Sequence, residues 1–342
     1  MINVLNKKII VIVMIVAVIL FLILLVGELG SGREAKQWCF ENKGQVIENQ
    51  KGKKGVDINI KNIEHLIEKK EIVVGVIDSG IDFSSEVLKS ACFINEGEIA
   101  GNKIDDDNNG YIDDVSGWNF YDNTSITYSN YTSDFHGTTI AGIIAGNTVG
   151  NIRFGVSTSI KVLPLKCFRG TKGDISDVVQ AIEYGYNMGV RIFNCSWDTM
   201  VFDEELYAIM KKYQNAIFVC SGGKTSSNLT ESPIYPACFE LDNVICVGGI
   251  NNRGDIYQFS GYGEEIDVYA PSKGIYCVMP DNTFAYSEGT SLATAFVTGA
   301  VALVYSPNVD ITADSICEMF RGNEKINRLN IEAVFNSINE KM

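Results

Sequence analysis

The chain has 342 residues, of which 46% are hydrophobic, and it carries a formal net charge of −14. This length and apolar content allow a large buried core, and the simplest division is one domain of about 250 to 280 residues plus an N-terminal extension. The acidic balance argues against nucleic acid as a partner, and we attribute it to solubility rather than to a preference for cationic peptides.

The first distinct element is an apolar run over residues 9–26 that contains no charged residue. As a helix it is long enough to cross most of a bilayer core. Lys7 and Lys8 precede it, which predicts that residues 1–8 are cytoplasmic and that the rest of the chain is outside the cytoplasm. A cleaved signal peptide is the alternative, but the run is long and residues 27–30 are a poor cleavage site. We therefore predict a single-pass anchor in the cell membrane.

Residues 27–59 are polar and rich in Lys, Asn and Gly, which predicts a stalk, and residues 60–70 have the apolar spacing of a short helix. Strand-like and helix-like runs then alternate, which predicts a layered α/β domain with a mainly parallel sheet over residues 60–338. The expected strands are Ile72–Ile77, Lys161–Leu165, Arg191–Asn194, Ala216–Cys220 and Val244–Val247, and the expected helices are Thr138–Ala145, Ser176–Asn187, Asp203–Tyr213 and Ser291–Tyr305.

The chain contains nine cysteines, an odd number, so not all of them can pair within one molecule. Cys195, Cys220 and Cys246 lie in or beside apolar strand-like runs, where cysteine commonly acts as a small buried hydrophobic residue. No Cys-x-x-Cys pair occurs, which excludes zinc-ribbon and thioredoxin-like motifs. An external location permits disulfides, but the sequence leaves their pattern open.

Three short motifs supply an acid, a base and a nucleophile. Asp78 follows a predicted strand, at the sheet edge where open α/β sheets place their sites. His136 is one of two histidines, and the other, His65, lies in the predicted helix over residues 60–70. Ser291 begins a predicted helix, whose free N–H groups can stabilise an oxyanion. Each residue alone has an ordinary explanation, but together, in the order Asp, His, Ser, they predict the triad of a serine hydrolase.

On these motifs the chain resembles the subtilisin-like serine peptidases, the subtilase family. The resemblance covers residues 60–338 and includes the segment Gly117–Phe120 and the strand Ile192–Ser196. It implies a three-layer α/β/α domain that hydrolyses peptide bonds of a peptide or protein substrate through an acyl-enzyme on Ser291. The chemistry that it implies requires no cofactor.

The resemblance also implies which residues flank the pocket for the substrate residue that precedes the scissile bond. Subtilases often have glycine where this chain has Asp198. Two roles are open for the carboxylate of Asp198. It either favours a substrate with lysine or arginine in that pocket, or it points to solvent. The residues that the resemblance places beside the pocket are Ser196, Trp197, Asp198, Ser221 and Gly222.

The chain departs from the family at Gly223, which stands where subtilases have an asparagine whose side-chain amide donates to the oxyanion. The loss of this donor costs about 2.7–4 kcal/mol, or roughly 10²–10³ in turnover, a magnitude taken from subtilisin. The backbone N–H of Ser291 remains, and a water held by Gly223 or the side chain of Asn228 could substitute. We therefore predict a slow serine endopeptidase; the alternative is a catalytically weak or inactive subtilase that binds peptides or regulates a partner.

An acidic loop precedes the segment Gly117–Phe120, as it does in other subtilases. Its oxygen-bearing side chains occupy positions 1, 3, 5 and 9 of an EF-hand-like calcium loop, but position 12 is Ser116 rather than glutamate. The loop is either a structural Ca²⁺ site or a surface turn rich in Asp and Asn. The candidate ligands are Asp105, Asp107, Asn109 and Asp113.

Overall fold

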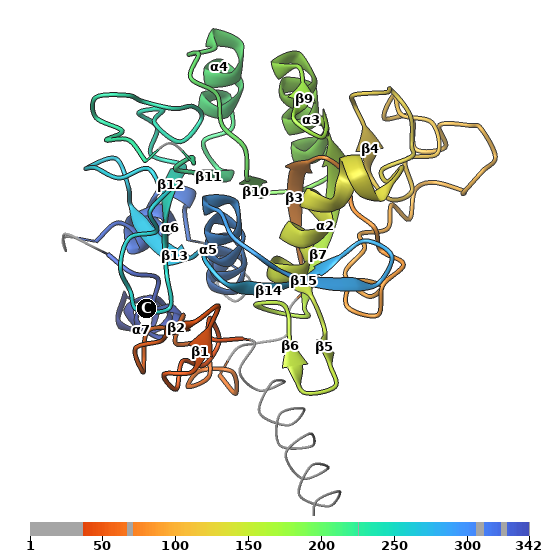
Figure 1. Cartoon of the computed structure of the whole chain (residues 1–342). Helices are drawn as coiled ribbons and strands as arrows, with labels where there is room; N and C mark the ends of the chain where they lie inside the picture. The colour runs from red at the N-terminus through yellow and green to blue at the C-terminus, as the bar shows by residue number, and fades with distance from the viewer. Residues whose placement is uncertain (1–36, 67–70, 225, 306–310, 323–326, 342) are drawn as a thin grey trace, which may run out of the picture. The chain divides into compact units, whose positions relative to one another are not determined.

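The computed structural model describes residues 37–66, 71–224, 226–305, 311–322 and 327–341 (Figure 1). The predicted cytoplasmic segment 1–8 and the apolar run 9–26 lie outside these residues. Within the described part of the chain, no helix is both long enough and apolar enough to cross a membrane.

A seven-stranded sheet in the order β13-β12-β11-β10-β3-β7-β4 forms the centre of the domain. Every neighbouring pair in it is parallel. Its strands are apolar runs, rich in Val and Ile, that are buried along most of their length, as expected where helices cover both faces. All five predicted strands are present. The strands are β3 (Ile72–Asp78), β4 (Trp118–Asn119), β7 (Ile160–Lys166), β10 (Ile192–Cys195), β11 (Ile217–Ser221), β12 (Val244–Ile250) and β13 (Val268–Pro271).

Helices cover both faces of this sheet. The helices α2 (Tyr131–Ala145) and α5 (Thr290–Tyr305) pack against each other on one face, and α3 (Ile175–Asn187) and α4 (Glu204–Lys212) lie on the other (Figure 1). Helix α5 contacts β10 to β13 and is buried almost throughout, which explains why its sequence is apolar all round. The prediction of a three-layer α/β/α domain with a mainly parallel sheet is confirmed.

Shorter elements complete the described chain. The helices α6 (Ala313–Phe320) and α7 (Ile331–Lys341) follow α5. Four antiparallel ribbons flank the main sheet, and one of them, formed by β14 and β15, leads directly into α5. The ribbon strands are β1 (Val46–Ile47), β2 (Gln50–Lys51), β5 (Thr148–Val149), β6 (Ile152–Arg153), β8 (Phe168–Arg169), β9 (Lys172–Gly173), β14 (Ile275–Met279) and β15 (Thr283–Ser287).

The prediction of a stalk over residues 27–59 is wrong for residues 37–59, which belong to the same compact unit as the sheet. The side chains of Trp38 and Phe40 are buried, and the Phe40 ring meets the ring of Phe296 in α5 edge-on, with 5.7 Å between the centroids. A few apolar side chains, separated by polar residues, anchor this segment to the domain. Because the segment is polar on average, its composition does not indicate these anchors. We call it the N-terminal strap.

The prediction of a helix over residues 60–70 is also wrong for residues 60–66, which are the described part of that range. Residues 61–66 form successive turns, with the N–H of Ile63 bonded to the carbonyl of Ile60 and the N–H of Leu66 bonded to the carbonyl of Ile63. The apolar spacing arises because Ile60 and Ile63 are buried, while Leu66 is half exposed. Two buried side chains are too few to require a helix.

The nine cysteines are all described, and all are free thiols. Cys195, Cys220 and Cys246 are buried, as predicted, on three neighbouring strands. Strand pairing places Cys195 beside Cys220 and Cys220 beside Cys246. Burial raises the pKa of Cys220 well above its usual value, so this thiol stays protonated and acts as a small apolar group.

Candidate active site

Strand β3 and helix α2 bring Asp78 and His136 together. Asp78 is the last residue of β3, and His136 lies in the second turn of α2, which begins seven residues before the predicted start because Asn130 caps it at the N–H of Ser133. His136 Nδ1 lies 2.9 Å from both carboxylate oxygens of Asp78. The N–H of Ser79 donates to Asp78 Oδ1 over 2.7 Å, which fixes the carboxylate.

The electrostatics of this pair favour a protonated imidazole. Burial lowers the pKa of His136, but the charge of Asp78 and its hydrogen bond act in the opposite sense and prevail, so the pKa is raised. Because a general base must be neutral, activity is expected to rise with pH through this raised pKa. The contribution of the pair to stability has the opposite sign: it is complete below the unfolded-state pKa and is lost as the pH rises through the folded-state value.

Ser291 lies in the first turn of α5, after Gly289, whose φ of 147° lies in the region that favours glycine. The Ser291 hydroxyl donates to the carbonyl of Ser196 over 2.9 Å, and the Ser196 hydroxyl donates back to the carbonyl of Ser291 over 2.9 Å. A hydroxyl has one proton, so that of Ser291 must turn from Ser196 to His136 before attack.

A second set of hydrogen bonds supports this tether. Asn194 Nδ2 donates to Ser196 Oγ over 2.9 Å, and Thr298 Oγ1 in α5 donates to Asn194 Oδ1 over 2.9 Å. These bonds join the end of β10 to the start of α5. Sequence reasoning missed Asn194 and Thr298, although an asparagine inside an otherwise apolar strand is a signal that could have pointed to the tether.

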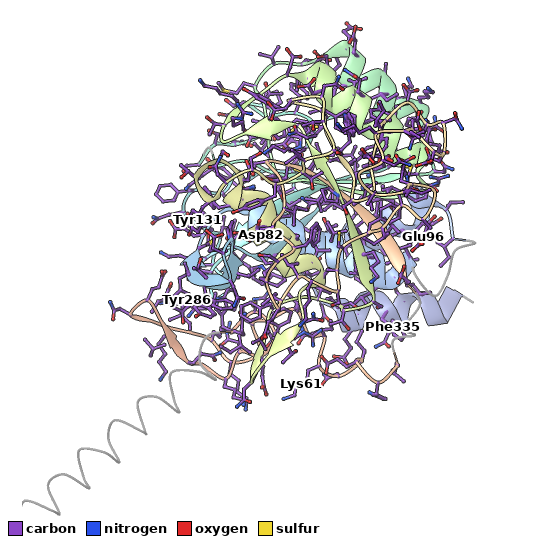
Figure 2. All side chains as sticks on the ribbon, turned by 90° about the vertical axis from the view of Figure 1, so that its right-hand side faces the viewer. Lys61, Asp82, Glu96, Tyr131, Tyr286 and Phe335 are labelled. Carbon is purple, nitrogen blue, oxygen red and sulfur yellow. The ribbon has the colours of Figure 1, made fainter. Side chains whose placement is uncertain are left out.

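His136 and Ser291 line the same pocket, which has a volume of about 220 Å³. Three segments far apart in the sequence therefore meet here: the end of β3 behind the histidine, the start of α2 and the start of α5. Phe135 also lines the pocket, and its ring stacks on that of Tyr131 with 6.5 Å between the ring centroids. Figure 2 shows Tyr131 at the surface, and both Tyr131 and Tyr286 are exposed.

Of the predicted pocket residues, Asp198 and Ser221 line the same pocket as Ser291. Burial raises the pKa of Asp198, and among the described residues no hydrogen bond or ion pair reaches its carboxylate. Ser221 donates from Oγ to Thr290 Oγ1 over 2.9 Å. The pocket therefore offers one carboxylate that lacks a partner.

The structure gives the other three predicted pocket residues different roles. Ser196 holds Ser291, as described above. Trp197 packs on the ring of Phe168, with 5.6 Å between the centroids. The N–H of Gly222 donates to the carbonyl of Val247 over 2.8 Å. None of these three is among the residues that line the pocket.

Gly223 has a φ of 75°, and its N–H donates to Ser221 Oγ over 3.3 Å. Asn228, which we considered as a substitute donor, is held elsewhere: its Oδ1 accepts the N–H of Thr230 over 3.2 Å, and its side chain does not line the pocket. Lys224 does line it, with its ammonium group 5.7 Å from the ring centroid of Phe259. Sequence reasoning missed this cation beside Gly223.

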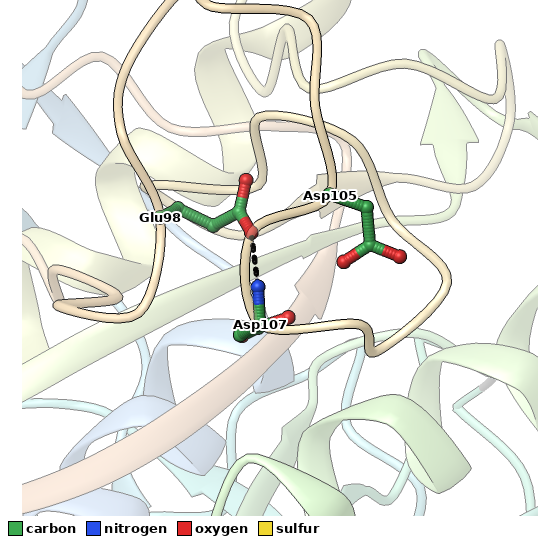
Figure 3. A group of neighbouring side chains, drawn as sticks. All are labelled: Glu98, Asp105 and Asp107. Atoms are coloured by element: carbon green, nitrogen blue, oxygen red, sulfur yellow. Dashed lines mark hydrogen bonds between the residues drawn. The ribbon is translucent and has the colours of Figure 1, made fainter.

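The acidic loop brings together Glu98, Asp105 and Asp107, whose nearest oxygens all lie within 4.8 Å of one another (Figure 3). The N–H of Asp107 donates to Glu98 Oε1 over 3.1 Å, as the dashed line in Figure 3 shows. These carboxylate oxygens are the ligands that Ca²⁺ prefers. Glu98 lies outside the EF-hand-like pattern, so sequence spacing could not have indicated it.

The other two predicted ligands lie differently: Asp113 is outside this group, whereas Asn109 Nδ2 donates to Asp107 Oδ2 over 3.1 Å. Both carboxylate oxygens of Asp113 accept backbone N–H groups, those of Asn102 and Lys103, each over 3.1 Å. Asn109 Oδ1 accepts the N–H of Tyr111 over 2.8 Å. Asp113 is therefore not part of the acidic group, and the role of Asn109 as a ligand stays a prediction.

The chain is similar to known proteins of one family. The model of the subtilase family matches residues 69–324. Subtilisin-like protease 1 of Plasmodium berghei is 30% identical over 72% of this chain, and subtilisin DY of Bacillus licheniformis is 29% identical over 72% of it. The matches cover 44% of the Plasmodium protein and 80% of the Bacillus protein, so the chain spans less than half the length of the former.

The fold has solved counterparts. The nisin leader peptidase NisP of Lactococcus lactis superimposes with a TM-score of 0.61 at 23% identity, over 81% of this chain and 92% of that one. At this identity the likeness shows the fold alone. It agrees with the three-layer architecture described above.

Proposed function

Because the chain belongs to the subtilase family, we propose that it is a serine endopeptidase that hydrolyses peptide bonds through an acyl-enzyme on Ser291. One observation carries the proposal: His136 and Ser291 line a single pocket, and Asp78 is bonded to the far side of the imidazole. An acid, a base and a nucleophile in this order are the parts that acyl transfer requires.

In the proposed reaction, the Ser291 hydroxyl turns from the Ser196 carbonyl to Nε2 of His136 and gives up its proton as Oγ attacks the peptide carbonyl. Asp78 holds the Nδ1 proton and stabilises the imidazolium. The imidazolium then protonates the leaving amine, and the acyl-enzyme forms. A water molecule that His136 deprotonates releases the acid product.

In this proposal the oxyanion has fewer hydrogen-bond donors than in other subtilases. The backbone N–H of Ser291, at the start of α5, is one donor for it, and the helix dipole has the right sign. Gly223 supplies no side-chain donor, so we propose that the enzyme turns over slowly.

We also propose that the apolar run over residues 9–26 anchors the enzyme in the cell membrane, with the catalytic domain outside the cytoplasm. The support is the sequence: an uncharged apolar run preceded by two lysines. Carbonate extraction, which strips peripheral proteins from membranes, tests the anchor. Release of the intact protein into the soluble fraction would count against it.

Fluorophosphonate labelling tests the proposed activity, because the probe reacts only with a serine that an adjacent base activates. The wild-type protein is expected to be labelled, and Ser291→Ala is expected not to be. If the folded wild-type protein takes up no label, the alternative function, a peptide-binding or regulatory subtilase, replaces this proposal.

We propose that Asp198 selects a lysine or arginine before the scissile bond. A carboxylate that lacks a partner and has a pKa raised by burial gains from a cation placed beside it. We expect Asp198→Asn to lower kcat/KM for arginine substrates about tenfold relative to leucine substrates, a difference of about 1.4 kcal/mol. Substrate profiling measures the ratio, and Glu288→Gln, which changes another acid of the same pocket, is the matched control. An unchanged ratio in Asp198→Asn means that this carboxylate only faces solvent.

For the acidic loop we propose a structural Ca²⁺ bound by Glu98, Asp105 and Asp107. At about 100 times its Kd, such an ion adds about 2.7 kcal/mol, which raises Tm by about 5 to 10 °C. Asp107→Asn should abolish the rise, whereas Asp113→Asn should keep it, because Asp113 is not in the group. Thermal melts in calcium and in EDTA measure the effect, and identical melts of the wild-type protein contradict the proposal.

A further inference from the structure

A buried ion pair that the proposed mechanism does not use lies behind the triad. Lys166 Nζ is 2.6 Å from Asp134 Oδ1, and both side chains are completely buried. Lys166 Nζ also donates to the carbonyl of Ser79, the residue after Asp78. The pair therefore contacts the ends of β3, β7 and α2 at the same place.

Each member of the pair is adjacent to one member of the Asp78–His136 hydrogen bond. Lys166 is the last residue of β7 and the direct strand partner of Asp78. Asp134 lies in the first turn of α2, two residues before His136. The ion pair thus joins β7 to α2 directly beside the hydrogen bond that joins β3 to α2, and neither of its residues lines the pocket.

Asp134 is also held by the segment that leads into α2. Its Oδ2 accepts the N–H of Ser129 over 2.6 Å, and its Oδ1 accepts the hydroxyl of Ser133 over 2.7 Å. Movement of the carboxylate would therefore move the first turn of α2. Because Lys166 holds this carboxylate, the position of that turn relative to β7 is fixed.

The backbones of α2 and the loop after β3 are unusually close at this point. A Cβ atom on Gly137 would lie 2.4 Å from the carbonyl oxygen of Gly80, and one on Gly80 would lie 3.2 Å from Lys166 Nζ. Only glycine fits both positions. The close approach places His136 within reach of Asp78, and the ion pair lies beside it.

Stability alone is a poor explanation for this pair. The desolvation of two charges offsets most of their attraction, and replacement of a buried pair by apolar residues is often neutral or stabilising. The pair lies directly beside the Asp78–His136 hydrogen bond, because Lys166 is the strand partner of Asp78 and Asp134 is on the same helix as His136. This placement points to a positioning role instead. We propose that Lys166 and Asp134 are positioning residues that hold the first turns of α2 so that His136 stays in hydrogen-bond contact with Asp78.

This inference rests on the proposed function, but one of its readouts needs no turnover. Proton NMR detects the downfield proton shared by His136 and Asp78. The chain has only two histidines, so His65→Ala and His136→Ala assign the signal. Fluorophosphonate labelling of the wild-type protein tests the proposed function separately.

The decisive variant is the double substitution Lys166→Met with Asp134→Leu, which removes both charges together and leaves neither partner unpaired. Lys166→Met and Asp134→Asn are made singly beside it. The matched control is Arg321→Met, which removes a partly buried ion pair with Asp267 whose residues do not line the pocket. Activities are compared per folded molecule at a pH above the raised pKa of His136.

We expect the double variant to unfold cooperatively, to keep KM within about threefold and to lose about 100-fold in kcat, the loss expected from a misplacement of about 1 Å. Its downfield proton signal is expected to disappear, whereas Arg321→Met retains both kcat and the signal. Asp134→Asn, which keeps the acceptor oxygen, should retain more activity than the double variant. A folded double variant with wild-type kcat and signal overturns the proposal, and failure of the double variant to fold makes the pair structural and overturns it too.

Discussion

Gly223→Asn is expected to raise kcat by about 10² to 10³ under the proposed function, in which Gly223 stands where a subtilase oxyanion hole has an asparagine amide. Asparagine is the side-chain donor best suited to the backbone at this position. Gly223 has a φ of 75°, and asparagine enters that region more readily than other residues that carry a side chain. The hydrogen bond from its N–H to Ser221 Oγ is unaffected, because it involves only the main chain of Gly223.

Peptidase assays of the purified protein measure this gain, with Gly223→Ala as the matched control. Alanine adds a Cβ atom at the same φ without a donor, so it separates backbone strain from the new hydrogen bond. A folded Gly223→Asn variant with wild-type kcat would show that the missing amide does not limit the enzyme. Lys224, whose ammonium-bearing side chain lines the pocket beside Gly223, would then be the first candidate for the second oxyanion donor.

Asp78→Asn is expected to lower kcat by about 10⁴, because the amide no longer holds the imidazole in the required tautomer or stabilises the imidazolium. Both oxygens of Asp78 lie 2.9 Å from His136 Nδ1, so the change acts directly on this contact. The pH profile should change as well. Without the negative charge, burial is the main remaining influence and lowers the pKa of His136, so the acidic limb of kcat/KM moves to lower pH.

The pH–rate profile distinguishes this effect from unfolding. A destabilised protein loses activity at every pH, whereas loss of the carboxylate both lowers the plateau and shifts the limb. His65→Ala, at the only other histidine, is the control and should leave the profile unchanged. If Asp78→Asn keeps the acidic limb of the wild-type protein, then Asp78 does not set the pKa of His136.

The central sheet could be predicted from the sequence because its strands are buried on both faces. Such strands are continuous apolar runs, and the run before Asp78 or the run at the start of β11 can be recognised without knowledge of its partners. The strap could not be predicted in this way. Its contacts depend on single residues such as Trp38 and Phe40 in a polar segment, and only the surface that they meet shows that they are anchors.

The loop and the pocket show the same limit. The EF-hand-like spacing predicted Asp113 as a ligand, but its carboxylate accepts the backbone N–H of Asn102 in a local turn. Glu98, which lies outside the loop pattern, belongs to the acidic group instead. Asp198 lines the same pocket as Ser291, whereas Trp197 beside it packs on Phe168 and does not line that pocket. Sequence spacing specifies positions along the chain, but the direction in which a side chain points depends on the backbone around it.

The sequence alone pointed to the proposed chemistry: the residue types at Asp78, His136 and Ser291 and their order need no coordinates, because reactivity belongs to the side chain. The tertiary structure decided what holds those groups in place. The partners Lys166 and Asp134 are 32 residues apart in the chain, and neither stands out in its local sequence. A buried charge can be interpreted only when its counter-charge is known, and folding is what brings the two together.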